Sequence, residues 1–254
     1  MPDTTFTYQE FKPAEPLQRF IQCYWIARRN ADFKPALRYI FADGLSEIFA
    51  NLSTSGISPF INGIVPLKPG RVYFGGTMTS TNTIISQPDT VFAGVRLKPG
   101  GISAFYKFNL LELVDEIIEL SDPGLYAILT EDPGLKERLD KFFLHKLDTR
   151  ILPIISMSEF VDHHQGRITV DELAKRHHIS RRSLERHFNS TIGIGPKEFI
   201  KVIRFHHLVQ KLQKKESSES LLRIAYEMGY YDHAHLTKEV KRYGGQTPSE
   251  LLSF

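Results

Sequence analysis

The chain has 254 residues, of which 41% are hydrophobic and 24% are charged, a composition typical of globular proteins with room for two cores. No apolar run reaches the roughly 18 residues that a membrane span needs, and the first residues lack the cationic and apolar regions of a signal peptide. We therefore expect a cytoplasmic protein with no membrane association, and its single cysteine, Cys23, fits a reducing compartment.

The net charge of +3 is unevenly distributed along the chain. Residues 165–254 hold 16 Lys and Arg against 10 Asp and Glu, whereas residues 1–164 hold 16 against 19. A basic part joined to a slightly acidic one indicates that only the C-terminal part meets a polyanion.

The N-terminal half alternates short segments rich in β-branched and aromatic residues with Gly or Pro turns. After Gly101 the apolar spacing becomes helical, from Ile102 to Ile118, and two or three helices are expected by residue 147. Asp43-Gly44, between two apolar runs, predicts a hairpin, because both residues tolerate the positive φ of a tight turn. Residues 1–147 are thus predicted to be an antiparallel barrel-like or sandwich domain with packed helices. The predicted strands are 22–28, 37–41, 46–52, 71–75 and 91–97.

The C-terminal part, residues 148–254, contains one pattern twice. When residues 174–200 are laid over 225–252, identical residues coincide, with one residue added in the turn of the second copy. Each copy reads as a short helix, a break, a cationic helix and Gly-x-x-Pro, which predicts a duplicated helix-turn-helix. The coinciding positions include Ala174 with Ala225, Leu184 with Leu236, Gly193 with Gly245, and Pro196 with Pro248.

The first unit is expected over about residues 169–192. Thr169 and Glu172 have the spacing of a capping box, and Ser180 is a second N-cap. With Leu184 and Phe188 turned into the core, a cationic stripe containing Arg182 and Arg186 remains on the exposed helix, where arginine can read guanine edges or pair with phosphates. The alternative is a solvated helix stabilised by an Arg181–Glu185 pair.

A long helix is predicted over about residues 196–213, followed by a polar loop at 214–218. Eighteen residues at about 1.5 Å each span roughly 27 Å. Together with the flanking units, this length brings two reading helices to about 34 Å, one turn of DNA.

The second unit is expected over about residues 220–244. Leu222, Ala225 and Met228 are predicted to face inward, and Asp232 to cap a helix that starts at His233. This helix is less basic than the first, so its DNA contacts are expected to be weaker or more dependent on shape.

Four motifs connect this region with a known family: Ser180-x-x-x-Leu184-x-Arg186-x-Phe188, Gly193-x-x-Pro196, Ile224-Ala225-x-x-x-Gly229-Tyr230 and Gly245-x-Thr247-Pro248. They resemble the DNA-binding domain of the AraC/XylS family of bacterial transcription regulators, over about the last 90 residues. The resemblance implies two recognition helices in adjacent major grooves. The sequence departs from the family pattern at His178, Leu236 and Val240.

The residues expected to meet DNA are those at the positions of the family's contact residues, together with polar neighbours on the same helices. They are Ser180, Arg181, Arg182, Glu185, Arg186, Asn189, His233, Ala234, His235, Thr237, Lys238, Lys241 and Arg242.

The N-terminal half is similar to the β-rich sensory domains of a subset of these regulators. The similar motifs are Asp43-Gly44-x-x-Glu47, Phe74-Gly75-Gly76-x-x-Thr79 and Gly94-Val95-Arg96-x-x-Pro99-Gly100. In the wider family such a domain binds a small effector, dimerises, or does both. The residues that could line a pocket with one cation, for an anionic or polar ligand, are Trp25, Tyr39, Phe49, Phe74 and Arg96; the alternative is that they are ordinary core aromatics and a surface arginine.

Enzymatic readings find little support in the sequence. Residues 1–144 contain no histidine, so a cupin-type metal centre lacks its usual ligands, and nucleophile, phosphate-loop and dinucleotide motifs are absent from the sequence. We expect no catalytic residues, no metal and no cofactor.

The leading hypothesis is a transcription regulator that binds double-stranded DNA, forms a homodimer, and works with RNA polymerase and a small-molecule effector. The alternative is a non-enzymatic β-domain interaction protein whose helical C-terminal domain binds a protein partner.

Overall fold

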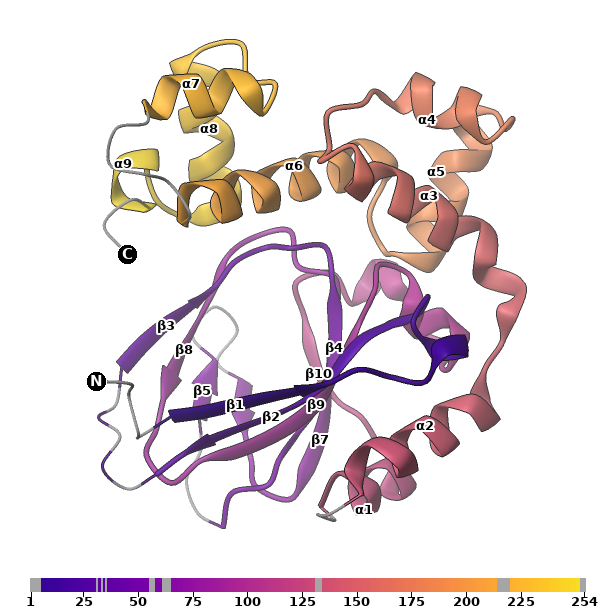
Figure 1. Cartoon of the computed structure of the whole chain (residues 1–254), viewed down its shortest axis with the longest axis vertical. Coiled ribbons are helices and arrows are strands. Elements are labelled where there is room, and N and C mark those ends of the chain that lie inside the picture. The colour runs from indigo at the N-terminus through magenta and orange to yellow at the C-terminus, as the bar shows by residue number, and fades with distance from the viewer. Residues whose placement is uncertain are drawn as a thin grey trace.

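The computed structural model describes residues 6–30, 32, 34, 36–54, 58–60, 65–130, 134–213 and 220–251. The N-terminal part forms two antiparallel sheets that together make a barrel-like body (Figure 1). The six-stranded sheet has the order β1 (Phe6–Phe11), β2 (Ile21–Arg29), β9 (Val91–Leu97), β4 (Ser46–Asn51), β7 (Arg71–Gly75) and β10 (Ile117–Glu119). The four-stranded sheet has the order β3 (Ala36–Ile40), β8 (Asn82–Ser86), β5 (Ser58–Phe60) and β6 (Val65–Leu67).

The two faces of the six-stranded sheet have different roles, because successive side chains of a strand point to opposite faces. Tyr24, Ile48 and Phe74 belong to the main core, which continues into the helices. Trp25 and Phe49 lie on the other face, in a smaller cluster with Cys23, Ala27, Leu67, Tyr73 and Phe92. The side chains on this second face therefore line the interior of the barrel, and most of them are aromatic.

All five predicted strands are present, but two local predictions are wrong. Asp43-Gly44 does not close a hairpin: β3 pairs with β8, whereas β4 pairs with β7 and β9. Gly44 does have a positive φ of 72°, so the turn chemistry was recognised but the strand partners were not. The region 102–118 is not a regular helix, because it contains 3-10 turns at Gly101–Ala104 and Leu110–Glu112 and then enters β10.

Two helices follow the sheets, as predicted. They are α1 (Pro123–Thr130) and α2 (Leu135–Lys146). Asp140 anchors α2 to the barrel, since its Oδ1 accepts a 2.9 Å hydrogen bond from the Tyr24 hydroxyl and a 2.8 Å bond from the Ala14 amide.

The C-terminal part is helical, with α6 as its central element. Its helices are α3 (Leu152–His163), α4 (Val170–Arg176), α5 (Arg181–Thr191), α6 (Pro196–Gln213), α7 (Leu221–Glu227), α8 (His233–Gly244) and α9 (Pro248–Leu251). α4 and α5 lie at one end of α6, and α7 and α8 lie at the other (Figure 1). The polar loop predicted at 214–218 lies outside the described residues. Leu222 is not an inner residue, because its side chain is 42% exposed and Ile224 takes the buried position.

α6 lies across one end of the barrel (Figure 1). The Phe41 ring packs edge-on against Phe205 of α6, with 6.5 Å between centroids. A Cβ on Gly44 would lie 3.1 Å from both Phe199 and Ile203. The two parts of the chain thus share one continuous core. None of the helices in the described part of the chain is both long and apolar enough to cross a membrane.

Candidate nucleic-acid interface and ligand cavity

The first helix-turn-helix comprises α4 and α5, and each helix begins at the predicted cap. Thr169 and Glu172 form a complete capping box at α4, and the Ser180 hydroxyl accepts a 3.2 Å bond from the Ser183 amide at α5. In the turn, His178 has a φ of 53°, the left-handed conformation that explains why glycine is usual there. The turn therefore keeps its geometry although His178 replaces the glycine of the family pattern.

The exposed face of α5 carries the predicted cationic stripe. Arg182, Glu185 and Arg186 are exposed, while Leu184 and Phe188 are fully buried. Two other predicted DNA contacts on this unit are less free. The Arg181 guanidinium is paired with Asp171 of α4, and Asn189 is half-buried.

The second recognition helix, α8, is capped by Asp232, whose Oδ1 accepts a 2.7 Å bond from the His235 amide. Five predicted contact residues are exposed: His233, Ala234, Lys238, Lys241 and Arg242. Two others, His235 and Thr237, are half-buried. The Thr237 hydroxyl lies 3.3 Å from His233 Nδ1.

A buried ion cluster fixes α8 to α6. Glu239 of α8 has a side chain only 4% exposed, with its Oε1 2.8 Å from Lys201 Nζ and its Oε2 3.0 Å from Arg204 Nη2. The Arg204 guanidinium also lies 5.1 Å from the centre of the Tyr230 ring. Burial alone would raise the pKa of Glu239, but the hydrogen bond from Lys201 and the charge of Arg204 hold this pKa below its ordinary value.

Arg242 belongs to a second α8–α6 connection. Its Nη2 lies 2.7 Å from Glu198 Oε1, and the Tyr243 hydroxyl donates a 3.0 Å bond to the same oxygen. Arg242 therefore holds α8 against α6, a structural role that differs from the DNA contact predicted for it. The sequence feature that could have indicated this role is the presence of Glu198 and Glu239, since acidic residues among the basic ones of a helical unit often form internal ion pairs.

The loop between β7 and β8 contacts the ends of both recognition helices. The Thr77 hydroxyl donates a 2.7 Å bond to the carbonyl of Ile192, the C-cap of α5. The Thr81 hydroxyl donates a 2.7 Å bond to the carbonyl of Tyr243, in the last turn of α8. Both threonines are buried. This connection is not predictable from the sequence, because nothing local distinguishes a threonine that packs across domains.

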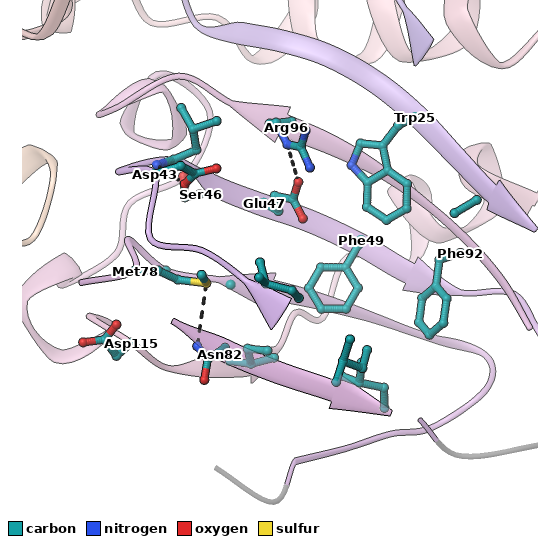
Figure 2. Close-up of a pocket in the computed structure, with 18 of the residues that line it drawn as sticks. Trp25, Asp43, Ser46, Glu47, Phe49, Met78, Asn82, Phe92, Arg96 and Asp115 are labelled. Atoms are coloured by element: carbon teal, nitrogen blue, oxygen red, sulfur yellow. Dashed lines mark hydrogen bonds and ion pairs between the residues drawn. The ribbon is translucent and has the colours of Figure 1, made fainter. Parts of the chain in front are cut away.

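A cavity of about 280 Å³ lies inside the barrel, between the two sheets (Figure 2). Its walls are mostly apolar, and its charged groups include Arg96, Glu47 and Asp43. Arg96 Nε donates a 2.6 Å bond to Glu47 Oε1. Burial raises the pKa of both Asp43 and Glu47, although the Arg96 charge opposes the rise.

The structure brings together three of the five residues predicted for an effector pocket. Trp25, Phe49 and Arg96 line the cavity. Phe74 does not, because it lies on the opposite face of the sheet and stacks on Phe108. Tyr39 does not line it either, since its ring stacks on Phe41, the neighbour of α6. The prediction of these last two residues was wrong.

No group of three His, Cys, Asp or Glu side chains forms a metal-ion site within the described ranges.

The protein thus combines a barrel-like domain with a pair of capped helix-turn-helix units that share one central helix. Comparisons with known proteins identify it further. Residues 173–253 match a family described as a helix-turn-helix domain. Residues 9–119 match one described as a domain of unknown function (DUF6597).

Among curated proteins, the chain is 29% identical over 117 residues to the lactose operon transcription activator of Staphylococcus xylosus, covering 46% of this chain and 41% of that protein. It is 34% identical over 82 residues to a Streptomyces antibioticus protein named as an AraC-like transcription regulator, covering 32% of this chain and 26% of that one. The match thus spans less than half the length of these relatives.

Among solved structures, ToxT from Vibrio cholerae shares the fold, with a TM-score of 0.52 and 15% identity over 98% of both chains. The chain carries a helix-turn-helix domain, similar to that of an AraC-like regulator, on a ToxT-like fold. This finding confirms the AraC/XylS resemblance and the predicted fold class.

Proposed function

We propose that the protein is a sequence-specific, non-enzymatic transcription regulator that acts in the cytoplasm and places α5 and α8 in two adjacent major grooves of double-stranded DNA. The observation that carries this proposal is the pair of capped helices with exposed polar faces at opposite ends of the 18-residue α6. A helix of that length spans about 27 Å, which suits two grooves one turn apart.

The proposed set of DNA-reading residues comprises exposed and half-buried predicted contacts of both units, with Arg182 and Arg186 as its strongest members. Ser180, Glu185, Asn189, His233, Ala234, His235, Thr237, Lys238 and Lys241 complete it. Arg181 and Arg242 are assigned to bracing, because each guanidinium already pairs with a carboxylate.

The proposed partners extend beyond DNA. A small effector in the barrel cavity is supported by the size and apolar lining of that cavity; a ToxT structure with a TM-score of 0.51 was solved bound to (E)-4-(8-methylnaphthalen-1-yl)but-3-enoic acid. A homodimer is supported by β1, which forms an edge of the six-stranded sheet and exposes Phe6 and Tyr8. RNA polymerase is supported by a relative that is named a transcription activator.

The test of DNA binding is its salt dependence. Neutralised phosphates release counterions, so we expect the affinity of the full chain for duplex DNA to fall steeply as salt rises, with a log–log slope of about −4 or steeper. A flat salt dependence, or no binding to DNA from the source genome, would contradict the proposal.

A protein-binding role for the helical part is the second candidate. It is favoured by three exposed apolar side chains of the α7 region, Leu222, Tyr226 and Tyr231, which are 42%, 56% and 85% exposed. If the chain bound a protein through this patch and showed no salt-dependent DNA binding, this second function would replace the first.

A further inference from the structure

The charged end of the barrel cavity surrounds one cation with carboxylates. Arg96 lies opposite Glu47 in the strand register, and its Nη1 lies 3.9 Å from Glu10 Oε1. Asp43 adds a third carboxylate, close enough to interact electrostatically with Arg96. A single guanidinium therefore faces three acids, and an anionic ligand group would meet net repulsion here.

The cavity also contains a hydrogen-bond donor that lacks an acceptor. Trp25 is 8% exposed, and its Nε1 is buried without a hydrogen-bond partner among the described residues. The indole nitrogen lies on the side of the ring toward Arg96 and Glu47 (Figure 2). A buried donor without an acceptor is destabilising, so a ligand that supplies an acceptor at this position binds more favourably.

Apolar walls account for the rest of the site. Phe49, Phe92, Ile84 and Leu67 line the cavity, whose volume of about 280 Å³ lies near the lower end of the range for ligand pockets. The occupant is therefore small, with an apolar body.

We propose that the cavity binds a small apolar molecule with a positively charged amine and a hydrogen-bond acceptor. The amine is held by Asp43 and Glu47 against the aromatic wall, and the acceptor is held by Trp25 Nε1. This inference rests on the proposed function, in which the barrel senses an effector, and it assigns the cavity a cationic ligand instead of the anionic or polar one that Arg96 alone indicated.

The test uses three matched probes: 4-methoxyphenethylamine, 2-(4-methoxyphenyl)ethanol and 3-(4-methoxyphenyl)propanoate. Trp25 is the only tryptophan of the chain, so its fluorescence reports binding in the cavity directly. We expect the amine to bind roughly tenfold or more tightly than the carboxylate, with the alcohol between them.

The double variant Asp43→Asn/Glu47→Gln should abolish this preference, and Asp43→Asn alone should reduce it if the double variant fails to fold. Asp115→Asn is the control, because this rim carboxylate is already held by the Thr79 amide at 2.7 Å. Equal binding of amine and carboxylate, tighter binding of the carboxylate, or no fluorescence response to the amine would each overturn the proposal. DNA affinity measured on the same protein separates this failure from failure of the regulator assignment.

A second inference follows from the loop between β7 and β8, independently of any ligand. Gly76 and Met78 of this loop line the cavity, as does Asn82 at the start of β8. Asn82 Nδ2 lies 3.7 Å from Met78 Sδ. Thr77 and Thr81 of the same loop hold the ends of α5 and α8, respectively, through the two 2.7 Å bonds described above. One short segment thus contacts the cavity and both recognition helices.

We infer that this loop couples the cavity to the two recognition helices. Hydrogen exchange of the full chain, without ligand or DNA, tests the coupling. Met78→Ala, on the cavity side, should accelerate amide exchange in the last turns of both α5 and α8 by roughly threefold or more. Thr77→Val should act mainly on α5 and Thr81→Val mainly on α8. Thr79→Val is the control, because its side chain bonds to Asp115. Unchanged exchange of both helices in Met78→Ala would overturn the inference.

Discussion

The exposed arginines of α5 differ in whether a carboxylate already pairs with them. Arg186 and Arg182 project from α5 without a carboxylate partner among the described residues, whereas Arg181 is paired with Asp171. The sequence alone does not distinguish these three arginines. Their surroundings do: Arg182 and Arg186 are available to contact DNA, whereas the Arg181 side chain is engaged in an intramolecular ion pair.

Arg186→Ala should weaken specific DNA binding by about 1 to 3 kcal/mol, the loss of one good base contact. Fluorescence anisotropy with a selected operator measures it, and circular dichroism checks the fold. Arg181→Ala on the same helix is the matched control and should cost less than about 1 kcal/mol. An unchanged affinity in Arg186→Ala would remove this residue from the set of DNA-reading residues.

Glu239→Gln should destabilise the protein by about 2 to 4 kcal/mol, because it leaves Lys201 and Arg204 without their counter-charge. The pKa of Glu239 is lowered in the folded protein, so its contribution is present above the ordinary glutamate pKa and is lost as pH falls through the folded value. Urea unfolding at several pH values should therefore show a gap between wild type and variant that narrows in acid. A gap that widened in acid would contradict this role.

At the scale of elements, the sequence predicted what depends on local chemistry. The caps at Thr169, Ser180 and Asp232, the bounds of α6 and five strands follow from side chains close to where they act. What depends on a distant partner could not be derived. The prediction of Phe74 as a pocket residue failed in this way. Phe74 is one residue from the cavity face, and only the strand register, Phe49 opposite Tyr73, reveals which side chains of the strand face inward.

Gly94 of β9 provides a test of the sheet packing. It lies between Trp25 and Phe49 in the register, and a Cβ there would lie 2.7 Å from both the Ile48 carbonyl and the Trp25 ring. Gly94→Ala should destabilise the protein by about 1 to 3 kcal/mol and change Trp25 fluorescence. Gly75→Ala is the control, since its Cβ would meet nothing closer than 3.8 Å. Equal melting temperatures of the two variants would contradict the close packing of Trp25 against β9.

At the scale of the whole molecule, the barrel and the helical part are joined by a shared core. Phe199, Ile203 and Phe205 of α6 are all buried, with the barrel residues Phe41 and Gly44 against them. The predicted domain boundary near residue 148 remains a prediction, because continuity of packing neither requires nor forbids independent folding.

We expect a fragment of residues 148–254 to fold and bind DNA with a lower melting temperature than the full chain, because its removal from the barrel exposes the apolar side of α6. Circular dichroism and anisotropy measure both properties. An insoluble fragment, or a folded one that does not bind DNA bound by the full chain, would show that the boundary is wrong.

In the proposed DNA complex, one protomer places two helices in successive major grooves. Hydroxyl-radical footprinting on an operator, with a monomeric form of the protein, tests it most directly. We expect protection on one face of the duplex over two successive helical turns, about 34 Å apart. Protection limited to a single turn per protomer would contradict it.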